Sequence, residues 1–165
     1  MKKILFTILA CLAFLSNVTY AKEPSVFDFV ISLKNDSAND CVLKKQQIIY
    51  GRLTKGTVVP EVLFRGQTMS FMMRKHGYYK EKSDYTTGNL FDAQILLTYE
   101  CGDNETITLM SHRIMKEAGA DRRIRGVILD QNHLDATFTT SKPSVFTQSP
   151  SKIDWVITNA KDGTL

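Results

Sequence analysis

Residues 90–110 read LFDAQILLTYECGDNETITLM and carry the clearest fold signal in the chain. An apolar run at residues 90–99 is followed by the turn-forming residues 102–105 (Gly-Asp-Asn-Glu), and residues 106–110 then alternate threonine with aliphatic side chains. Two such segments around a turn rich in glycine, aspartate and asparagine are typical of a β-hairpin. The stretch therefore predicts antiparallel sheet in the middle of the chain.

The same two-residue period recurs on both sides of this hairpin. In residues 27–33 (FDFVISL), Phe27 and every second residue after it are apolar, which predicts a strand with one face in the core. Met69 and Met73 alternate in the same way, so we expect both of them in the core. Other predicted strands begin at residues 41, 57, 61 and 153.

Two segments leave more than one interpretation open. Residues 125–129 and 134–139 straddle the polar turn 130–133 and predict a second hairpin. Residues 111–123 are the one candidate helix, although Gly119 disfavours it. About eight to ten short strands at regular spacing predict an all-β protein, namely an antiparallel β-sandwich in one domain.

The first 21 residues have the pattern of a secretory signal peptide. Lys2 and Lys3 precede a short apolar run, and small residues (Thr19 and Ala21) stand at the positions that a signal peptidase reads. The run is too short for a transmembrane helix, which needs about 20 apolar residues. We expect cleavage after Ala21, a mature domain of residues 22–165, and a secreted or periplasmic protein of bacterial type.

The number of cysteines and the net charge of the predicted mature chain are consistent with an exported protein. Cys41 and Cys101 remain after cleavage, and an oxidising compartment favours a disulfide between them, with α-carbons about 5–6 Å apart. A thiolate nucleophile or a metal ligand is the alternative. Without Lys2 and Lys3 the chain has 19 basic and 17 acidic residues, a net charge of +2. That excess is too small to predict nucleic-acid binding.

Four common motifs for catalysis or cofactor binding are absent from the sequence, which excludes specific families but not every enzyme. It contains no G-x-S-x-G elbow, no H-E-x-x-H zinc helix, no Walker loop and no EF-hand. A zinc site would need His76, His112 and His133 to converge with Asp130 or Asp135, whereas scattered histidines beside polar neighbours are usually surface residues. Glycoside hydrolysis would need a pair of carboxylates at a fixed separation. The candidates Glu61, Asp92 and Glu100 cannot be distinguished by sequence from ordinary acids on the surface of a strand. We therefore expect a protein without catalytic activity, metal or cofactor.

Two charged stretches are candidate binding surfaces. Residues 74–85 combine three tyrosines with four basic residues, a composition that suits an interface with a glycan, an anionic lipid or a protein. Residues 122–125 contain three arginines that could hold a phosphate or a carboxylate. In both stretches the alternative is a solvated loop or connector. The candidate ligand-binding residues are Arg74, Lys75, Tyr78, Tyr79, Tyr85, Arg122 and Arg123.

Two resemblances suggest a function class. The order of strands, with Phe29 and Ile31 in the first, the tyrosine-rich stretch and a closing strand at residues 153–157, loosely resembles small secreted β-sandwich proteins of the aegerolysin or actinoporin type. That resemblance implies recognition of lipid or membrane surfaces, although the chain has one tryptophan, Trp155, where those families are Trp-rich. Residues 99–103 (Tyr-Glu-Cys-Gly-Asp) are similar to the Tyr-x-Cys start of bacterial periplasmic C-type lysozyme inhibitors, whose later cysteine this chain lacks.

The combined expectation is an exported, non-enzymatic binding protein that contacts a host or membrane surface. Its partner would be a protein, a glycan or a lipid surface, with no nucleic acid and no transmembrane segment in the mature chain. The alternative is a secreted or periplasmic inhibitor of an enzyme such as lysozyme.

Overall fold

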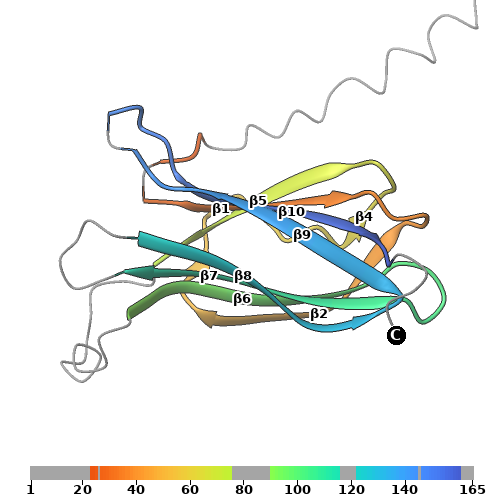
Figure 1. Ribbon diagram of the computed structural model, residues 1–165. Helices are drawn as coiled ribbons and strands as arrows, with labels where there is room; N and C mark the ends of the chain where they lie inside the picture. The colour runs from red at the N-terminus through yellow and green to blue at the C-terminus, as the bar shows by residue number, and fades with distance from the viewer. Residues whose placement is uncertain (1–22, 26, 76–89, 116–121, 145, 161–165) are drawn as a thin grey trace, which may run out of the picture.

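The computed structural model of the protein describes residues 23–25, 27–75, 90–115, 122–144 and 146–160. In this part of the chain ten β-strands occur and no helix, so the all-β prediction is confirmed. No helix in the described part is long and apolar enough to cross a membrane. The strands form two five-stranded sheets packed face to face as a β-sandwich (Figure 1).

Each sheet combines strands from distant parts of the sequence. The first sheet has the order β3 (Arg52–Leu53), β5 (Thr68–Arg74), β1 (Phe29–Asn35), β10 (Ser151–Asn159) and β9 (Leu134–Ser141). The second sheet has the order β4 (Val62–Leu63), β2 (Cys41–Tyr50), β6 (Leu90–Glu100), β7 (Thr106–Met115) and β8 (Arg122–Asn132). Only β1 and β10 run parallel among these pairs, and the other neighbours are antiparallel.

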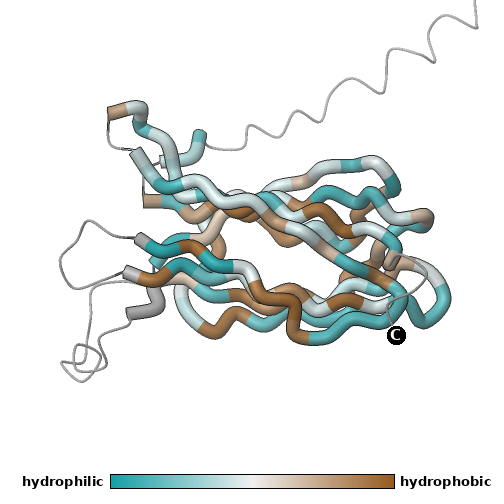
Figure 2. The backbone as a smooth tube through the Cα atoms, in the orientation of Figure 1, coloured by the Kyte–Doolittle hydropathy of each residue, from teal (hydrophilic) through white to brown (hydrophobic). Residues whose placement is uncertain are grey.

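The core lies between the sheets and consists of the alternate residues that each inner face presents. Apolar positions recur along the strands of both layers (Figure 2). Phe29, Ile31 and Leu33 of β1 are fully buried, as are Ile95 of β6 and Ile107 of β7. The hairpin predicted from residues 90–110 is therefore confirmed, with Tyr99 opposite Ile107 in the register of β6 and β7.

The predicted second hairpin is wrong. β8 and β9 follow one another closely but belong to different sheets, because β8 pairs with β7 and β9 pairs with β10. The chain crosses from one layer to the other at His133, which adopts a left-handed backbone with φ of 57°. Local turn residues indicate a reversal of the chain, but they do not indicate whether the next strand returns to the same sheet.

Three smaller expectations also need correction. The candidate helix at residues 111–123 is contradicted in its described parts, because β7 extends to Met115 and β8 begins at Arg122. Met73 is in the core as predicted, whereas Met69 remains 36% exposed near the start of β5. Phe27 precedes β1 and is 62% exposed, so the buried alternation begins at Phe29.

Cys41 and Cys101 form the predicted disulfide, fully buried in the core. Their α-carbons are 4.0 Å apart, closer than the 5–6 Å that we expected. The register explains the difference, because Val42 pairs with Glu100 and the two cysteines are the next opposed positions on β2 and at the end of β6. Opposed residues on adjacent antiparallel strands come within about 4.5 Å at narrow pairs. The bond therefore links neighbouring strands of one sheet.

Trp155 of β10 packs across the sandwich against the second sheet. Its indole Nε1 donates a hydrogen bond to Ser111 Oγ of β7 at 2.8 Å, and its ring centroid lies 4.9 Å from that of Phe138. A β-carbon at Gly126 of β8 would lie 2.5 Å from Trp155 Cζ2 and 2.9 Å from Phe138 Cδ1. Gly126 therefore makes room for the two aromatic rings.

Gly126→Ala is expected to destabilise the protein by about 1–3 kcal/mol, because the added methyl group overpacks this contact. Urea unfolding followed by Trp155 fluorescence measures the change. Gln131→Ala, at an exposed position of the same strand, is the control and should alter the free energy of unfolding by less than about 0.5 kcal/mol. Equal stability of the two variants would contradict this packing role.

Candidate functional site

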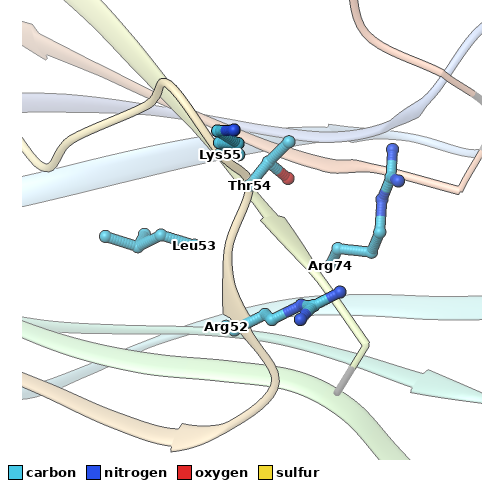
Figure 3. Close-up of a pocket in the computed structure, with 5 residues that line it drawn as sticks. All are labelled: Arg52, Leu53, Thr54, Lys55 and Arg74. Carbon is cyan, nitrogen blue, oxygen red and sulfur yellow. The ribbon is translucent and has the colours of Figure 1, made fainter. Parts of the chain in front are cut away.

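A pocket of about 310 Å³ opens at the β3–β5 edge of the first sheet. Its lining is rich in basic side chains and is drawn in Figure 3. The five residues that line it are Arg52, Leu53, Thr54, Lys55 and Arg74.

Strand register explains why these side chains meet. Arg52 of β3 is directly opposite Arg74 of β5, and Leu53 is opposite the buried Met73. Because side chains alternate between the faces of a strand, Leu53 packs on the core while Arg52 lies on the other face with Arg74. In Figure 3 Leu53 points away from both arginines.

A tight turn places Lys55 at the pocket. Thr54 N donates to Met72 O at 2.8 Å, and Thr57 N donates to Thr54 O at 3.0 Å, which closes the turn. Gly56 within it has a φ of 86°, a backbone conformation that favours glycine. Lys55 is therefore held at the exposed tip of the turn, one residue beyond the buried Thr54.

The carboxylate of Asp28 orients Arg74. Asp28 is only 1% exposed and lies just before β1, opposite Arg74 if the β1–β5 register is continued by one residue. Arg74 Nε donates to Asp28 Oδ1 at 2.9 Å, and Arg74 Nη2 donates to Oδ2 at 3.0 Å. Thr54 Oγ1 donates to Oδ1 at 3.1 Å, and Ser25 donates to Oδ2 through both its backbone N and its hydroxyl. One buried acid thus joins the N-terminal segment, the turn and β5.

These contacts change the ionisation of Asp28. Burial alone raises the pKa of a carboxyl group, but the hydrogen bonds from Ser25, followed by the hydrogen bond and the positive charge of Arg74, outweigh it. The pKa of Asp28 is therefore below its ordinary value of 3.8. The ion pair is fully formed at neutral pH.

Arg113 of β7 ties the second sheet to the same segment. Its Nη1 donates to Asp28 O at 2.9 Å, its Nη2 donates to Phe27 O at 3.2 Å, and its guanidinium lies 5.6 Å from the centroid of the Phe29 ring. Arg113 is almost completely buried. Asp28 is therefore held by one arginine from each sheet, by Arg74 through its carboxylate and by Arg113 through its backbone carbonyl.

Two exposed phenylalanines lie on segments that flank strands at this end of the sandwich. Phe29 and Ser151 are paired where the parallel strands β1 and β10 begin, so the segment before β1, which contains Phe27, and the β9–β10 connection are at the same end of the sandwich. Figure 1 shows the starts of β1 and β10 at this end. Phe146 is at the tip of that connection, which is closed by the Ser144–Ser149 bridge, and its side chain is fully exposed. Exposed phenylalanines on short connections are available for contact with another surface.

Charged residues divide unequally between the two ends of the sandwich. Strand directions place basic side chains at the end with the pocket and acidic ones at the opposite turns. The basic residues at the pocket end include Arg52, Lys55, Arg74, Lys75, Arg123 and Lys142. The acidic residues at the opposite end include Asp36, Asp40, Asp103, Glu105, Asp130 and Asp135. Glu23 and the buried Asp28 are acidic residues at the pocket end, and Lys34 and Arg65 are basic residues at the other end, but among the described residues the pocket end is still the more positive of the two.

The structure brings together only part of the predicted ligand-binding set. Arg74 lines the pocket, and Lys75 follows it half-buried. Arg123 is exposed near the start of β8, where Arg122 begins the strand but its side chain lies outside the described part. Tyr78, Tyr79 and Tyr85 also lie outside the described residues, between the end of β5 and the start of β6.

Sequence reasoning missed Asp28, Arg52, Lys55 and Phe146. Arg52 and Lys55 look like ordinary surface residues until the β3–β5 register places them beside Arg74. One signal was available for Asp28, because an acid within an aromatic and aliphatic alternation needs a partner if it is buried. Its partner, Arg74, is 46 residues away and cannot be identified from local spacing.

The histidines and carboxylates considered as candidate metal ligands or catalytic groups do not form a cluster among the described residues. No cluster of three or more metal-binding side chains occurs among the described residues. His112 is buried, which corrects the surface expectation, and its pKa is lowered by burial and by the nearby charge of Arg125. His133 is in the β8–β9 turn, and His76 is outside the described residues. Glu100 pairs with Lys44 at 2.9 Å, Glu61 is exposed, and the side chain of Asp92 is outside the described part.

Comparison with known proteins gives likeness in fold. No family model matches the chain, and neither does any curated protein sequence. The match to the lipid-binding protein Nakanori covers 82% of this chain and 72% of the Nakanori chain, with a TM-score of 0.53 and 10% sequence identity. The match to IP-1A from Alcaligenes faecalis covers 83% of this chain and 94% of the IP-1A chain, with a TM-score of 0.51 and 7% identity. The match to RahU, whose structure was solved in complex with a TRIS molecule, covers 85% of this chain and 100% of the RahU chain, with a TM-score of 0.55 and 8% identity.

These neighbours share the β architecture with this chain at identities that carry information about fold alone. The loose resemblance to small β-sandwich proteins is thus supported at the level of the fold. A closer assignment to the aegerolysin or actinoporin type is not shown, because no family model matches.

Acid is expected to destabilise the protein partly through Asp28. Because the pKa of Asp28 is lower in the folded chain than in the unfolded chain, its contribution is present at neutral pH and is lost as the pH falls below about 4. Asp28→Asn should cost about 2 kcal/mol at pH 7 and should flatten the loss of stability between about pH 5 and pH 2. Urea unfolding at a series of pH values measures both effects.

The control is Asp36→Asn, which removes the exposed pair with Lys34 at the opposite end of the sandwich. This variant should lose less than about 1 kcal/mol, because exposed ion pairs contribute little to stability. If Asp28→Asn kept the full acid dependence of the unaltered protein, Asp28 would not be the group responsible.

Proposed function

We propose that this protein is an exported, non-enzymatic binding protein whose pocket end attaches to an anionic lipid surface. The observation that carries the proposal is the combination at one end of the sandwich of exposed Phe27 and Phe146 with an excess of basic side chains. Apolar side chains enter the interfacial region of a bilayer, and basic residues are attracted to its anionic headgroups.

The charge distribution gives such a contact a direction. An anionic surface attracts the basic end and repels the acidic end, so the long axis of the sandwich turns towards the surface before contact. Each basic residue near an anionic membrane contributes about 1 kcal/mol, and salt screens this attraction. The predicted anchors Tyr78, Tyr79 and Tyr85 belong in sequence to the connection between β5 and β6, two strands whose adjoining ends are at the pocket end.

Two further observations support the proposal. Nakanori, a protein described as lipid-binding, shares the fold, and a fold of this kind is therefore compatible with that activity. The buried disulfide between Cys41 and Cys101 is typical of proteins that mature in an oxidising compartment, which supports a secreted or periplasmic location.

The inhibitor alternative receives no comparable support. Tyr99 and Cys101, which carried the local similarity to lysozyme inhibitors, are both fully buried. Tyr99 donates its hydroxyl hydrogen to Pro60 O at 2.7 Å, and burial raises its pKa. In this chain these two residues have structural roles in the core.

Vesicle co-sedimentation tests the proposal. The protein should be retained by vesicles of phosphatidylcholine with phosphatidylserine, more weakly by phosphatidylcholine alone, and less at high salt. The double variant Phe27→Ala with Phe146→Ala should bind at least about tenfold more weakly, because it removes two interfacial side chains.

Phe64→Ala is the matched control, since Phe64 is 56% exposed on the turn between β4 and β5 at the opposite end. It should bind like the unaltered protein. Equal retention of this control and of the double variant, or no retention of the unaltered protein on either kind of vesicle, would refute the proposed function.

The tyrosines of residues 74–85 provide a second test. Replacing Tyr78 and Tyr79 by alanine should leave the thermal unfolding midpoint unchanged and should abolish retention on the same vesicles, because the aromatic anchors predicted from the sequence are removed. Unchanged retention would exclude these two tyrosines as anchors.

A further inference from the structure

We infer that the pocket lined by Arg52, Thr54, Lys55 and Arg74 binds a phosphate group, carried by a lipid headgroup or by a free phosphate. The lipid source rests on the proposed function, whereas the phosphate chemistry rests on the pocket itself. Four features of the pocket support the inference: its opposed arginines, the fixed orientation of Arg74, its uncompensated charge and its size.

The two arginines occupy opposed positions on neighbouring strands, and this pairing of like charges does not stabilise the fold. Arg52 and Arg74 are a directly opposed pair on β3 and β5. Like charges at opposed positions destabilise a sheet, and β3 is only two residues long, so little backbone pairing offsets the repulsion. An anion between the two side chains would turn this repulsion into attraction.

Arg74 is already oriented for such an anion. Asp28 and Ser25 accept hydrogen bonds from the Nε and Nη2 groups of its guanidinium. Within the described part of the chain, Nη1 of Arg74 donates no hydrogen bond to a protein acceptor. Because the planar guanidinium is held on one side by a buried carboxylate, little side-chain entropy is lost when a ligand takes the remaining donors.

The charge of the pocket is not balanced. Arg52 and Lys55 are exposed and form no ion pair with any described residue, so among the described ion pairs only that of Arg74 with Asp28 balances a charge of the pocket. The excess of two positive charges corresponds to the charge of a phosphate monoester near neutral pH. Arginine also matches phosphate oxygens with two parallel donors, which favours phosphate over a simple halide ion.

Size supports the same class of ligand. At about 310 Å³ the pocket is at the small end of the range for small-molecule sites. A phosphate with a short substituent, such as glycerol, fits this volume. The position of the pocket at the basic end would bring a headgroup phosphate to Arg52 and Lys55 while Phe27 and Phe146 contact the same surface.

The test uses inorganic phosphate and glycerol 3-phosphate as soluble probes in isothermal titration calorimetry with the mature chain. Saturable binding is expected. The double variant Arg52→Gln with Lys55→Gln should weaken it at least about tenfold, because two charge-assisted contacts are removed. Arg74 is left unchanged, because its pair with Asp28 also holds the N-terminal segment.

The matched control is Lys45→Gln with Arg65→Gln, which removes the same two kinds of charge at exposed positions on β2 and on the β4–β5 turn. It should bind the soluble phosphates like the unaltered protein. An equal loss in both double variants would show only a general effect of net charge and would overturn the phosphate site. Absence of saturable binding by the unaltered protein would overturn it as well.

Vesicles containing phosphatidic acid distinguish the two phosphate sources. If these vesicles retain the unaltered protein at least about tenfold better than the Arg52 and Lys55 variant, the ligand is a headgroup phosphate. If soluble phosphate binds but no vesicle is retained, the phosphate site stands and the membrane proposal fails. If vesicles retain both proteins equally and soluble phosphate does not bind, the membrane proposal stands and the phosphate site fails.

Discussion

The buried carboxylate of Asp28 is the group on which the pocket end of the sandwich depends. It accepts hydrogen bonds from Ser25, Thr54 and Arg74, which come from three separate segments of the chain. A buried charge is costly unless it is paired and hydrogen-bonded, so these partners hold one another in place. Arg113 adds a link from the second sheet through the neighbouring carbonyls.

This network connects folding to the proposed binding role. The hydrogen bonds from Arg74 that lower the pKa of Asp28 also fix the guanidinium of Arg74 at the pocket, and Arg113 holds the adjacent backbone that presents Phe27. Rigid groups lose little entropy on binding, which makes a site on strand ends more selective than a site on free loops. The stability of this end and the ligand recognition proposed for it therefore involve the same residues.

Solved structures with the same architecture are at most 10% identical among the three compared, so the fold tolerates wide changes in sequence. What such a sandwich requires is alternation on the inner faces of its strands, and many apolar residues can satisfy it. Function is then carried by strand ends and connections. Here those parts include an exposed Phe146 and the turn that holds Lys55, and neither contributes to the core.

Local pattern was sufficient for some elements and insufficient for others. The hairpin of β6 and β7 was predictable because its two strands are joined by a short turn and both alternate. The similar turn after β8 leads to the other sheet, because Leu134 and Ala136 of β9 bury against the core from the first sheet. Hydrophobic alternation on both sides of a turn occurs in the two cases, so only the packing of the layers distinguishes them.

The sequence by itself determined the all-β class, the central hairpin and the pairing of Cys41 with Cys101, since these depend on local periodicity and on the two cysteines that lie outside the predicted signal peptide. Only the tertiary structure decided which strands share a sheet, that Asp28 is buried against Arg74, and that Arg52 and Lys55 meet at one pocket. The reason is physical. Periodicity indicates which side of a strand is buried, whereas the partner of a charged group depends on contacts between segments far apart in the chain.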